Sequence, residues 1–185
     1  MKTSFIVKLL PIDDIDKETT IYQQIGDLAL CLFILIADDG ENVYTTKAPI
    51  YILKAIDISK EELIKAALEN TESYYPSVII SLNDLQTIVT CDNSLSGAVA
   101  LFYPQTCTKI AKILNDSFYA IPTSCKEYSI LPKRCFKYTV ATEALDAMDH
   151  VNPAYKLGKC ILYYDRKKDK LIVCKKEYNK DAYIF

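Results

Sequence analysis

The chain contains few of the residues on which most catalytic and metal-binding motifs depend. It has no tryptophan, a single histidine and only four glycines among its 185 residues. It lacks the two glycine-rich phosphate-binding motifs, the serine-centred hydrolase motif and the paired-histidine metalloprotease motif. With one histidine, a zinc site built from cysteine and histidine is disfavoured. We therefore expect no metal site and no cofactor.

Long apolar segments and a strong net charge are also missing. The most apolar run covers residues 28–37, far below the ~20 residues that a membrane helix needs. The apolar residues at the start of the chain are interrupted by Lys8 and are too few for a signal-peptide core. The formal net charge of −2 is too small to indicate a polyanionic partner. These features predict a cytoplasmic protein without a membrane partner.

The seven cysteines are odd in number, and no two of them form a C-x-x-C pair. Most stand inside apolar runs, as free cysteines do when they pack as small hydrophobic residues. A disulfide-stabilised scaffold is typically shorter and richer in loops and glycine. We expect reduced thiols.

Strand and helix patterns are mixed along the chain and do not alternate strictly. Half of the residues are hydrophobic and a quarter are charged, which is the balance of a globular protein with a core. Strand patterns cover residues 4–10, 27–37, 43–46, 78–82, 85–91, 98–102, 118–121, 128–131, 160–164 and 171–174. Helix patterns cover residues 48–56, 59–70, 104–114 and 139–150. Ser59 and Glu62 make a capping box at the start of the second, and Pro104 can take the first helical position of the third. We expect a single α+β domain over residues 1–185, in which about four helices pack on one mixed, mainly antiparallel sheet.

Four segments in a fixed order carry a resemblance to a known family: residues 27–32, 58–71, 97–104 and 119–132. With these segments the chain resembles an uncharacterised domain-of-unknown-function family from anaerobic Gram-positive bacteria. The resemblance covers most of the chain and implies an α+β domain and a bacterial source. It implies no catalytic residue, because none is known for the family. The family's histidine before a glutamate is replaced here by Lys126, which puts any histidine chemistry at that turn in doubt.

The turn at residues 122–127 is the first candidate site, because it gathers hydroxyl, thiol, amine and carboxylate groups. Cys125 stands between Ser124 and Lys126, and a thiol beside an amine can have a lowered pKa and act as a nucleophile. The alternative is a strand-joining turn whose hydroxyls satisfy backbone groups. We favour the alternative, since an activated thiol also needs a cleft.

A second candidate pairs the only histidine, His150, with the thiol of Cys135. His150 could also pair with Asp146, one helical turn earlier in the chain. At the end of a helix, however, a histidine is favoured simply because its partial positive charge opposes the helix dipole. We favour this structural role.

The C-terminal region is rich in basic residues. Arg166, Lys167, Lys168 and Lys170 stand close together, and tyrosines are interleaved with the basic residues around them. Basic and aromatic side chains on a hairpin can bind single-stranded nucleic acid. Lysines on a hairpin also prevent pairing of its edge with other strands. The second role is favoured, because the whole chain is slightly acidic and carries no RNA-binding signature.

The sequence thus favours a non-enzymatic protein-interaction or binding module with a protein partner, and it leaves a small-molecule ligand open. The alternative is a cysteine-dependent enzyme that uses Cys125 or Cys135, assisted by Ser124, Lys126 or His150. A weaker alternative is a nucleic-acid-binding accessory protein that uses the basic C-terminal hairpin.

Overall fold

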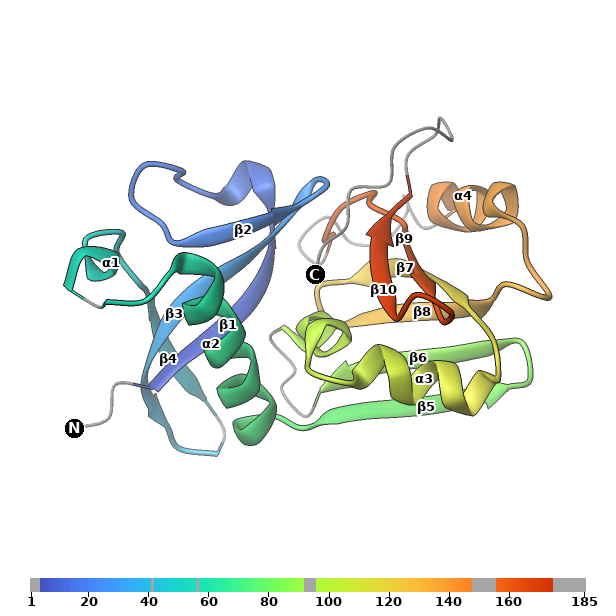
Figure 1. The fold of residues 1–185 in the computed structure, drawn as a ribbon, viewed down its shortest axis with the longest axis horizontal. Helices are drawn as coiled ribbons and strands as arrows, with labels where there is room; N and C mark the ends of the chain where they lie inside the picture. Colours follow the sequence, from blue (N-terminus) through green and yellow to red (C-terminus); the bar gives the residue numbers. More distant parts are fainter. Residues whose placement is uncertain (1–3, 41, 56, 92–95, 148–155, 175–185) are drawn as a thin grey trace.

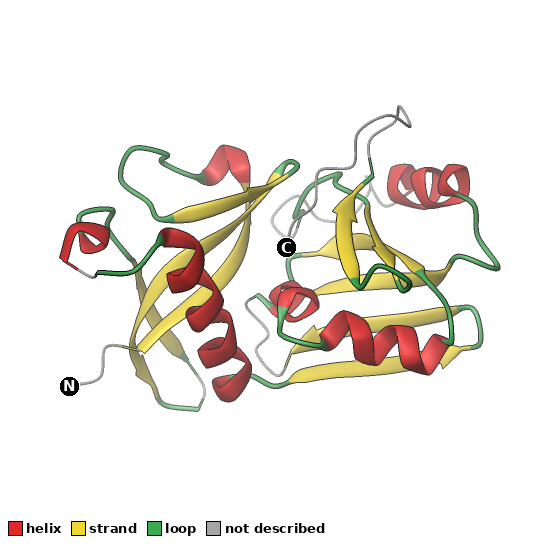
Figure 2. Cartoon of the chain, viewed as in Figure 1, coloured by secondary structure: helices red, strands yellow, loops and turns green. Residues whose placement is uncertain are grey.

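The computed structural model describes residues 4–40, 42–55, 57–91, 96–147 and 156–174. Their strands form two sheets, one built from the N-terminal part of the chain and one from the rest (Figure 1). Helices pack against both sheets (Figure 2). The predicted α+β class is confirmed, but the strands form two sheets rather than one. Every pairing between the described strands is antiparallel, so neither sheet is mixed.

The first sheet is built around one long strand. Its strands are β1 (Ser4–Pro11), β2 (Tyr22–Ile25), β3 (Leu28–Asp38) and β4 (Val43–Lys47). β3 pairs with β1 along one edge and with β2 and then β4 along the other. The first six residues of β3 are buried, as the uninterrupted apolar run predicted for a central strand.

The second sheet has six strands in the order β10-β9-β7-β8-β6-β5. They are β5 (Ser77–Asn83), β6 (Gln86–Cys91), β7 (Phe118–Ser124), β8 (Glu127–Pro132), β9 (Leu162–Asp165) and β10 (Lys170–Val173). Successive hairpins β5–β6, β7–β8 and β9–β10 account for three of its five pairings. The helices are η1 (Ile12–Asp14) and η2 (Gly97–Phe102), which are 3-10 helices, and α1 (Ile52–Ala55), α2 (Lys60–Tyr74), α3 (Thr106–Leu114) and α4 (Tyr138–Ala147).

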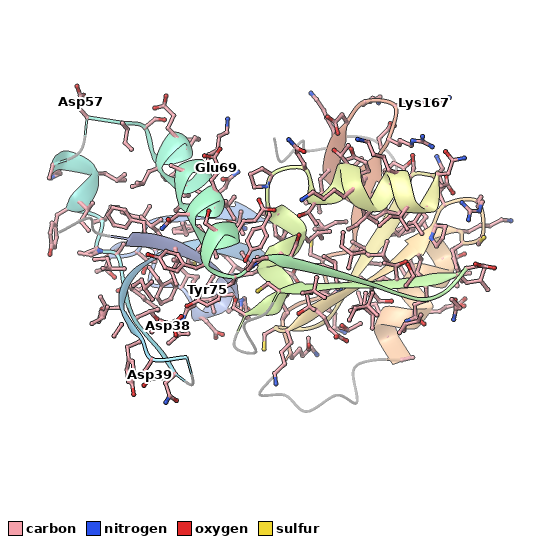
Figure 3. The ribbon with its side chains drawn as sticks, turned by 90° about the horizontal axis from the view of Figure 1, so that it is seen from below. Asp38, Asp39, Asp57, Glu69, Tyr75 and Lys167 are labelled. Carbon is pink, nitrogen blue, oxygen red and sulfur yellow. The ribbon has the colours of Figure 1, made fainter. Side chains whose placement is uncertain are left out.

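The helix α2 begins at the capping box that the sequence predicts. The Ser59 hydroxyl accepts from the Glu62 backbone N–H at 3.2 Å, and the Glu62 carboxylate accepts from the Ser59 backbone N–H at 3.0 Å. The helix continues four residues past its expected end near Asn70. Beyond its C-terminus, the Tyr75 hydroxyl donates to the Asp38 carboxylate at 2.9 Å, which ties the helix to the end of β3 (Figure 3).

The segment at residues 98–102 was expected to be a strand, and this prediction is wrong. It forms the 3-10 helix η2, in which all six residues are buried. A short run of apolar residues fits a buried strand and a buried helical turn equally well, so its pattern cannot distinguish them. Contacts with the turn at residues 125–126 accompany the helical form. A Cβ on Gly97 would lie 2.1 Å from the Lys126 carbonyl oxygen, and the Ala98 N–H donates to the Cys125 carbonyl at 3.2 Å.

Most buried apolar side chains of both sheets belong to one main core cluster, in which η2 takes part. A second, smaller cluster lies where α4 covers the other face of the six-stranded sheet. Its buried members are Tyr119, Ile121, Leu131, Ala141, Leu145 and Ile161. Among the described helices, none has the length and apolar character needed to cross a membrane.

The outer edge of β1 is bonded to side chains instead of to another strand. The Thr71 hydroxyl on α2 accepts from the Val7 backbone N–H at 2.8 Å and donates to the Ala67 carbonyl at 2.6 Å. The Ser96 hydroxyl accepts from the Leu9 N–H at 3.3 Å. α2 and the segment before η2 are therefore held to β1 by these hydroxyls as well as by apolar packing.

Replacing Thr71 by valine keeps the volume of the side chain but leaves the Val7 N–H buried without a partner. We expect Thr71→Val to lower the free energy of unfolding by about 1–3 kcal/mol. Hydrogen exchange at the Val7 amide should also become faster. The matched control, Thr71→Ser, keeps both hydrogen bonds, so the Val7 amide should stay protected in it. Equal exchange at Val7 in the two variants would show that this hydroxyl does not hold β1.

Candidate ligand pocket

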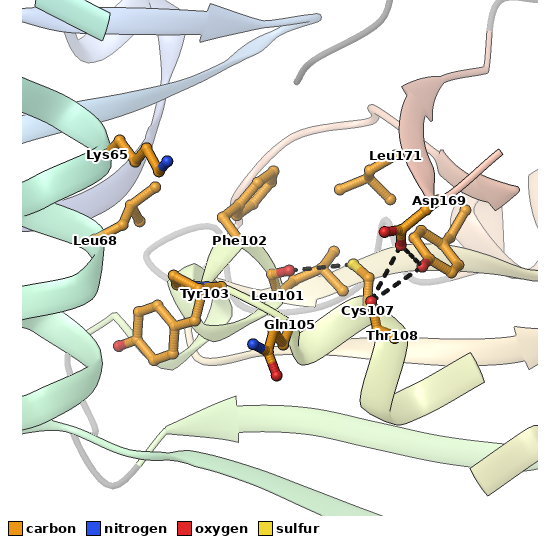
Figure 4. Close-up of a pocket in the computed structure, with 12 residues that line it drawn as sticks. Lys65, Leu68, Leu101, Phe102, Tyr103, Gln105, Cys107, Thr108, Asp169 and Leu171 are labelled. Carbon is orange, nitrogen blue, oxygen red and sulfur yellow. Dashed lines mark hydrogen bonds between the residues drawn. The ribbon is translucent and has the colours of Figure 1, made fainter. Parts of the chain in front are cut away.

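A cavity of about 550 Å³ opens where α2, α3 and the β9–β10 hairpin meet (Figure 4). Its lining is mostly apolar and comes from segments that are far apart in the sequence. The main apolar contributors are Leu68 on α2, Leu101 and Phe102 on η2, and Leu171 on β10. A volume between about 300 and 1,000 Å³ with a mostly apolar lining is typical of small-molecule binding sites.

The floor of the pocket is the connection between η2 and α3. Gln105 has a φ of 63° and directs the chain into the helix, which starts at Thr106. Pro104 was expected at the first helical position but lies two residues before it. The first turn of α3 then places Cys107 and Thr108 in the pocket wall. The Cys107 thiol donates to the Leu101 carbonyl at 3.3 Å, which joins η2 to α3.

One wall carries a hydrogen-bonded group of three side chains: Thr108, Tyr164 and Asp169. The Thr108 hydroxyl lies 3.2 Å from the Tyr164 hydroxyl and donates to Asp169 Oδ1 at 3.1 Å. The Tyr164 hydroxyl also donates to Asp169 Oδ1. The Tyr164 ring stacks on Phe118, with 5.2 Å between the ring centroids. These contacts fix the carboxylate of Asp169 at the rim of the pocket, as Figure 4 shows.

The electrostatics of this wall favour a fixed hydrogen-bond group over an acid or base. Burial first, and then the hydrogen bond to Asp169, raises the pKa of Tyr164 to about 12, so its phenol is neutral at physiological pH. Burial also raises the pKa of the Cys107 thiol far above its ordinary value, and nearby Asp169 raises it further. A neutral thiol is a poor nucleophile. The pocket wall therefore offers recognition groups and no activated nucleophile.

The opposite wall carries a positive charge. Lys65 on α2 lines the pocket, and its side chain points from the helix toward the space between the walls (Figure 4). Alongside the pocket, the ammonium of Lys109 on α3 lies 3.6 Å from the carboxylate of Glu72 on α2. The pocket thus has a carboxylate on one side, an ammonium on the other and an apolar surface between them.

The turn at residues 122–127 is a structural turn in its observed contacts. The Ser124 hydroxyl accepts from the Lys126 N–H at 3.1 Å, and the Lys126 carbonyl accepts from the Thr90 hydroxyl at 2.7 Å. Burial raises the pKa of the Cys125 thiol, and the charge of Lys126 lowers it by less. The lowered pKa considered for Cys125 is therefore not found. The Cys125 carbonyl in this turn accepts from the Ala98 N–H of η2, and catalysis by Cys125 stays a hypothesis.

The second candidate lies partly outside the described residues. Cys135 is exposed, and its backbone N–H donates to the Pro132 carbonyl at 3.1 Å in the loop before α4. His150 lies outside the described residues. The structure therefore leaves the Cys135–His150 pair a hypothesis. None of the seven cysteines, all of which are described, forms a disulfide.

The basic residues of the β9–β10 hairpin are exposed but partly engaged with the protein itself. The Arg166 guanidinium donates to the Asn115 side chain at 2.6 Å. The Lys168 ammonium lies 3.9 Å from the Asp165 carboxylate, which also accepts from the Lys167 N–H at 2.9 Å. Lys170 starts the edge strand β10. This arrangement gives a charged turn and a protected edge, and nucleic-acid binding stays a hypothesis.

Within the described residues there is no group of three or more histidine, cysteine, aspartate or glutamate side chains that could hold a metal ion. The pocket itself was missed by the sequence analysis. The sequence predicted no functional role for Cys107 or Asp169. No local motif links these residues, because the fold brings them together from α2, α3 and the last hairpin.

No protein-family model, curated protein or solved structure matches the chain. Its chemistry therefore has to be inferred from the pocket itself.

Thiol labelling tests whether a cysteine is activated. We expect iodoacetamide at neutral pH to modify the exposed Cys135 well before Cys125 and Cys107, because burial keeps the latter two thiols protonated. Peptide mapping by mass spectrometry at increasing times gives the order. If Cys125 were modified first, the hypothesis of a cysteine-dependent enzyme would regain support.

The raised pKa of Tyr164 predicts a loss of stability in alkali. An unfolded tyrosine ionises near pH 10, whereas Tyr164 in the folded protein ionises near pH 12. The folded state is therefore favoured by this group below pH 10, and the advantage disappears as the pH rises through 12. We expect the urea midpoint to fall over this range, and to fall less in Tyr164→Phe. The control is Tyr51→Phe, because Tyr51 is exposed. The urea midpoint of this variant should fall as much as that of the unsubstituted protein. An identical fall in Tyr164→Phe would show that this phenol is not held neutral.

Proposed function

We propose that the protein is a non-enzymatic binding module whose pocket takes a small amphipathic molecule. The observation that carries the proposal is the cavity of about 550 Å³, with its apolar lining and its fixed carboxylate. The neutral states of Cys107 and Tyr164 favour binding over covalent chemistry. The cysteine-dependent enzyme is the less supported alternative.

The two charges of the pocket define the ligand class. Asp169 Oδ1 is already occupied by Thr108 and Tyr164, so a ligand donor such as an ammonium or hydroxyl group would meet the carboxylate at its other oxygen. Lys65 on the opposite wall favours an acceptor such as a carboxylate. An apolar body between these ends would lie on the aliphatic and aromatic lining. The proposed ligand therefore has an apolar body with a donor at one end and an acceptor at the other.

We also propose a cellular location and a source for the protein. We propose that it is cytoplasmic, which is supported by seven cysteines that form no disulfide, since disulfides are rare in that compartment. Membership of the uncharacterised bacterial family also stays a proposal, supported by the order of the four resembling segments.

A set of three probes tests the ligand class. para-Aminomethylbenzoate carries both ends, benzylamine only the donor end and para-toluate only the acceptor end. We expect the first to bind more tightly than the other two. Asp169→Asn should weaken binding of the two amines about fivefold and leave para-toluate unchanged, since Asp169 is an exposed charge of modest worth. Titrations followed by NMR chemical shifts give the affinities.

The matched control is Asp84→Asn, which removes a carboxylate from the β5–β6 turn, away from the pocket. It should leave all three affinities unchanged. The pocket is tested separately by Leu171→Phe, which fills part of the cavity and should weaken every probe. If none of the probes shifted resonances of pocket residues, the proposed ligand class would be wrong.

A further inference from the structure

The edge strand β5 differs from the other sheet edges in this protein. It lies at the end of the six-stranded sheet and pairs only with β6. Its seven residues include no charge, no proline and no glycine. Natural proteins usually protect an edge with charged residues, proline, a short strand or a covering segment, because free backbone groups invite pairing with another strand.

Two of the other edges, those of β1 and β10, show such protection. On the outer edge of β1, the Val7 and Leu9 N–H groups donate to the hydroxyls of Thr71 and Ser96. At the other end of the six-stranded sheet, β10 has only four residues and begins with Lys170. In the part of the chain that the structure describes, no side chain bonds to the outer backbone edge of β5.

β5 also exposes a row of three apolar side chains at alternate positions, and its register against β6 shifts between Ser81 and Asn83. Val78, Ile80 and Leu82 are 37%, 44% and 53% exposed. Ile80 lies opposite Ile88 on β6, so the apolar surface extends from the edge into the sheet. The register across β6, β8 and β7 continues this face through Ser129 to Ile121, which packs in the cluster under α4. α4 thus covers the far half of the face, while the β5 half is open.

We propose that β5 pairs with β5 of a second copy of this chain, antiparallel and about a two-fold axis near Ile80. In this register Ile80 faces its own copy, Val78 faces Leu82, and Ser77 faces Asn83. Ile79 faces Ser81. The other pairs match apolar with apolar or polar with polar, and no two like charges are opposed. A symmetric dimer requires such a self-complementary patch. This match favours a second copy over an unrelated partner.

Such pairing would join the six-stranded sheets of two chains into one continuous sheet. The ligand pocket would stay open, because it lies beside α3, whereas the apolar row lies on the face that α4 covers; Figure 3 shows α3 and α4 on opposite sides of the sheet. The proposed dimer is therefore independent of the proposed ligand.

Sedimentation velocity of the full chain across micromolar concentrations tests the interface. We expect a concentration-dependent dimer with twice the mass of one chain. Ile80→Lys should give a monomer, because it places two ammonium groups against each other at the axis. The matched control is Ile36→Lys on β3, which also removes an exposed isoleucine (65% exposed) and should leave the dimer intact. Circular dichroism and thermal melts confirm that both variants fold.

A charge-complementation experiment tests the register. Ile80→Lys and Ile80→Glu should each be monomeric alone, and their equimolar mixture should restore the dimer. A monomeric unsubstituted protein, or a dimer that persists in Ile80→Lys, would overturn the proposal. Loss of the dimer without recovery in the mixture would overturn the two-fold arrangement at Ile80.

Discussion

The contact between the buried 3-10 helix η2 and the turn joining β7 to β8 connects the two halves of this fold. A side chain at Gly97 would collide with the Lys126 carbonyl oxygen, so the close approach depends on glycine at this position. The Ala98 N–H then donates to the Cys125 carbonyl. Just before η2, the Ser96 hydroxyl accepts from β1 of the first sheet. A backbone hydrogen bond on one side and a side-chain hydrogen bond on the other thus hold η2 between the sheets. The turn at residues 122–127, which the sequence offered as a candidate thiol site, therefore supports η2.

The pocket is a consequence of the same junction. η2 leads directly into α3, and α2 packs on the first sheet beside it, so the space between them is lined from both halves of the molecule. The last hairpin closes the remaining side through Tyr164, Asp169 and Leu171. A ligand in this position would contact α2, η2, α3 and β10 together. It would therefore stabilise the arrangement of the two sheets, by an amount that rises with the logarithm of its concentration relative to its Kd.

The treatment of sheet edges follows one physical requirement, which is that backbone N–H and C=O groups need partners. β1 obtains them from hydroxyl side chains, so its edge needs no further strand. β10 is too short and too charged to attract one. β5 has a register shift between Ser81 and Asn83 but no charged residue, and it exposes the apolar row Val78, Ile80 and Leu82. Of the edges of β1, β5 and β10, that of β5 is therefore the one without such protection in the described residues.

The sequence by itself determined the elements whose signals are local. It predicted the α+β class, the buried strand β3, the capping box at Ser59 and Glu62 and the final hairpin, because periodicity, caps and turn residues act over a few positions. Tertiary structure decided the rest. Residues 98–102 form a helix and not a strand. The sequence could not show this, because a segment that is buried on all sides has an uninterrupted apolar run without the period of either element. The division into two sheets depends on which edges are bonded, and the pocket joins residues from Lys65 to Leu171. These features arise from contacts between distant segments, to which no local pattern responds.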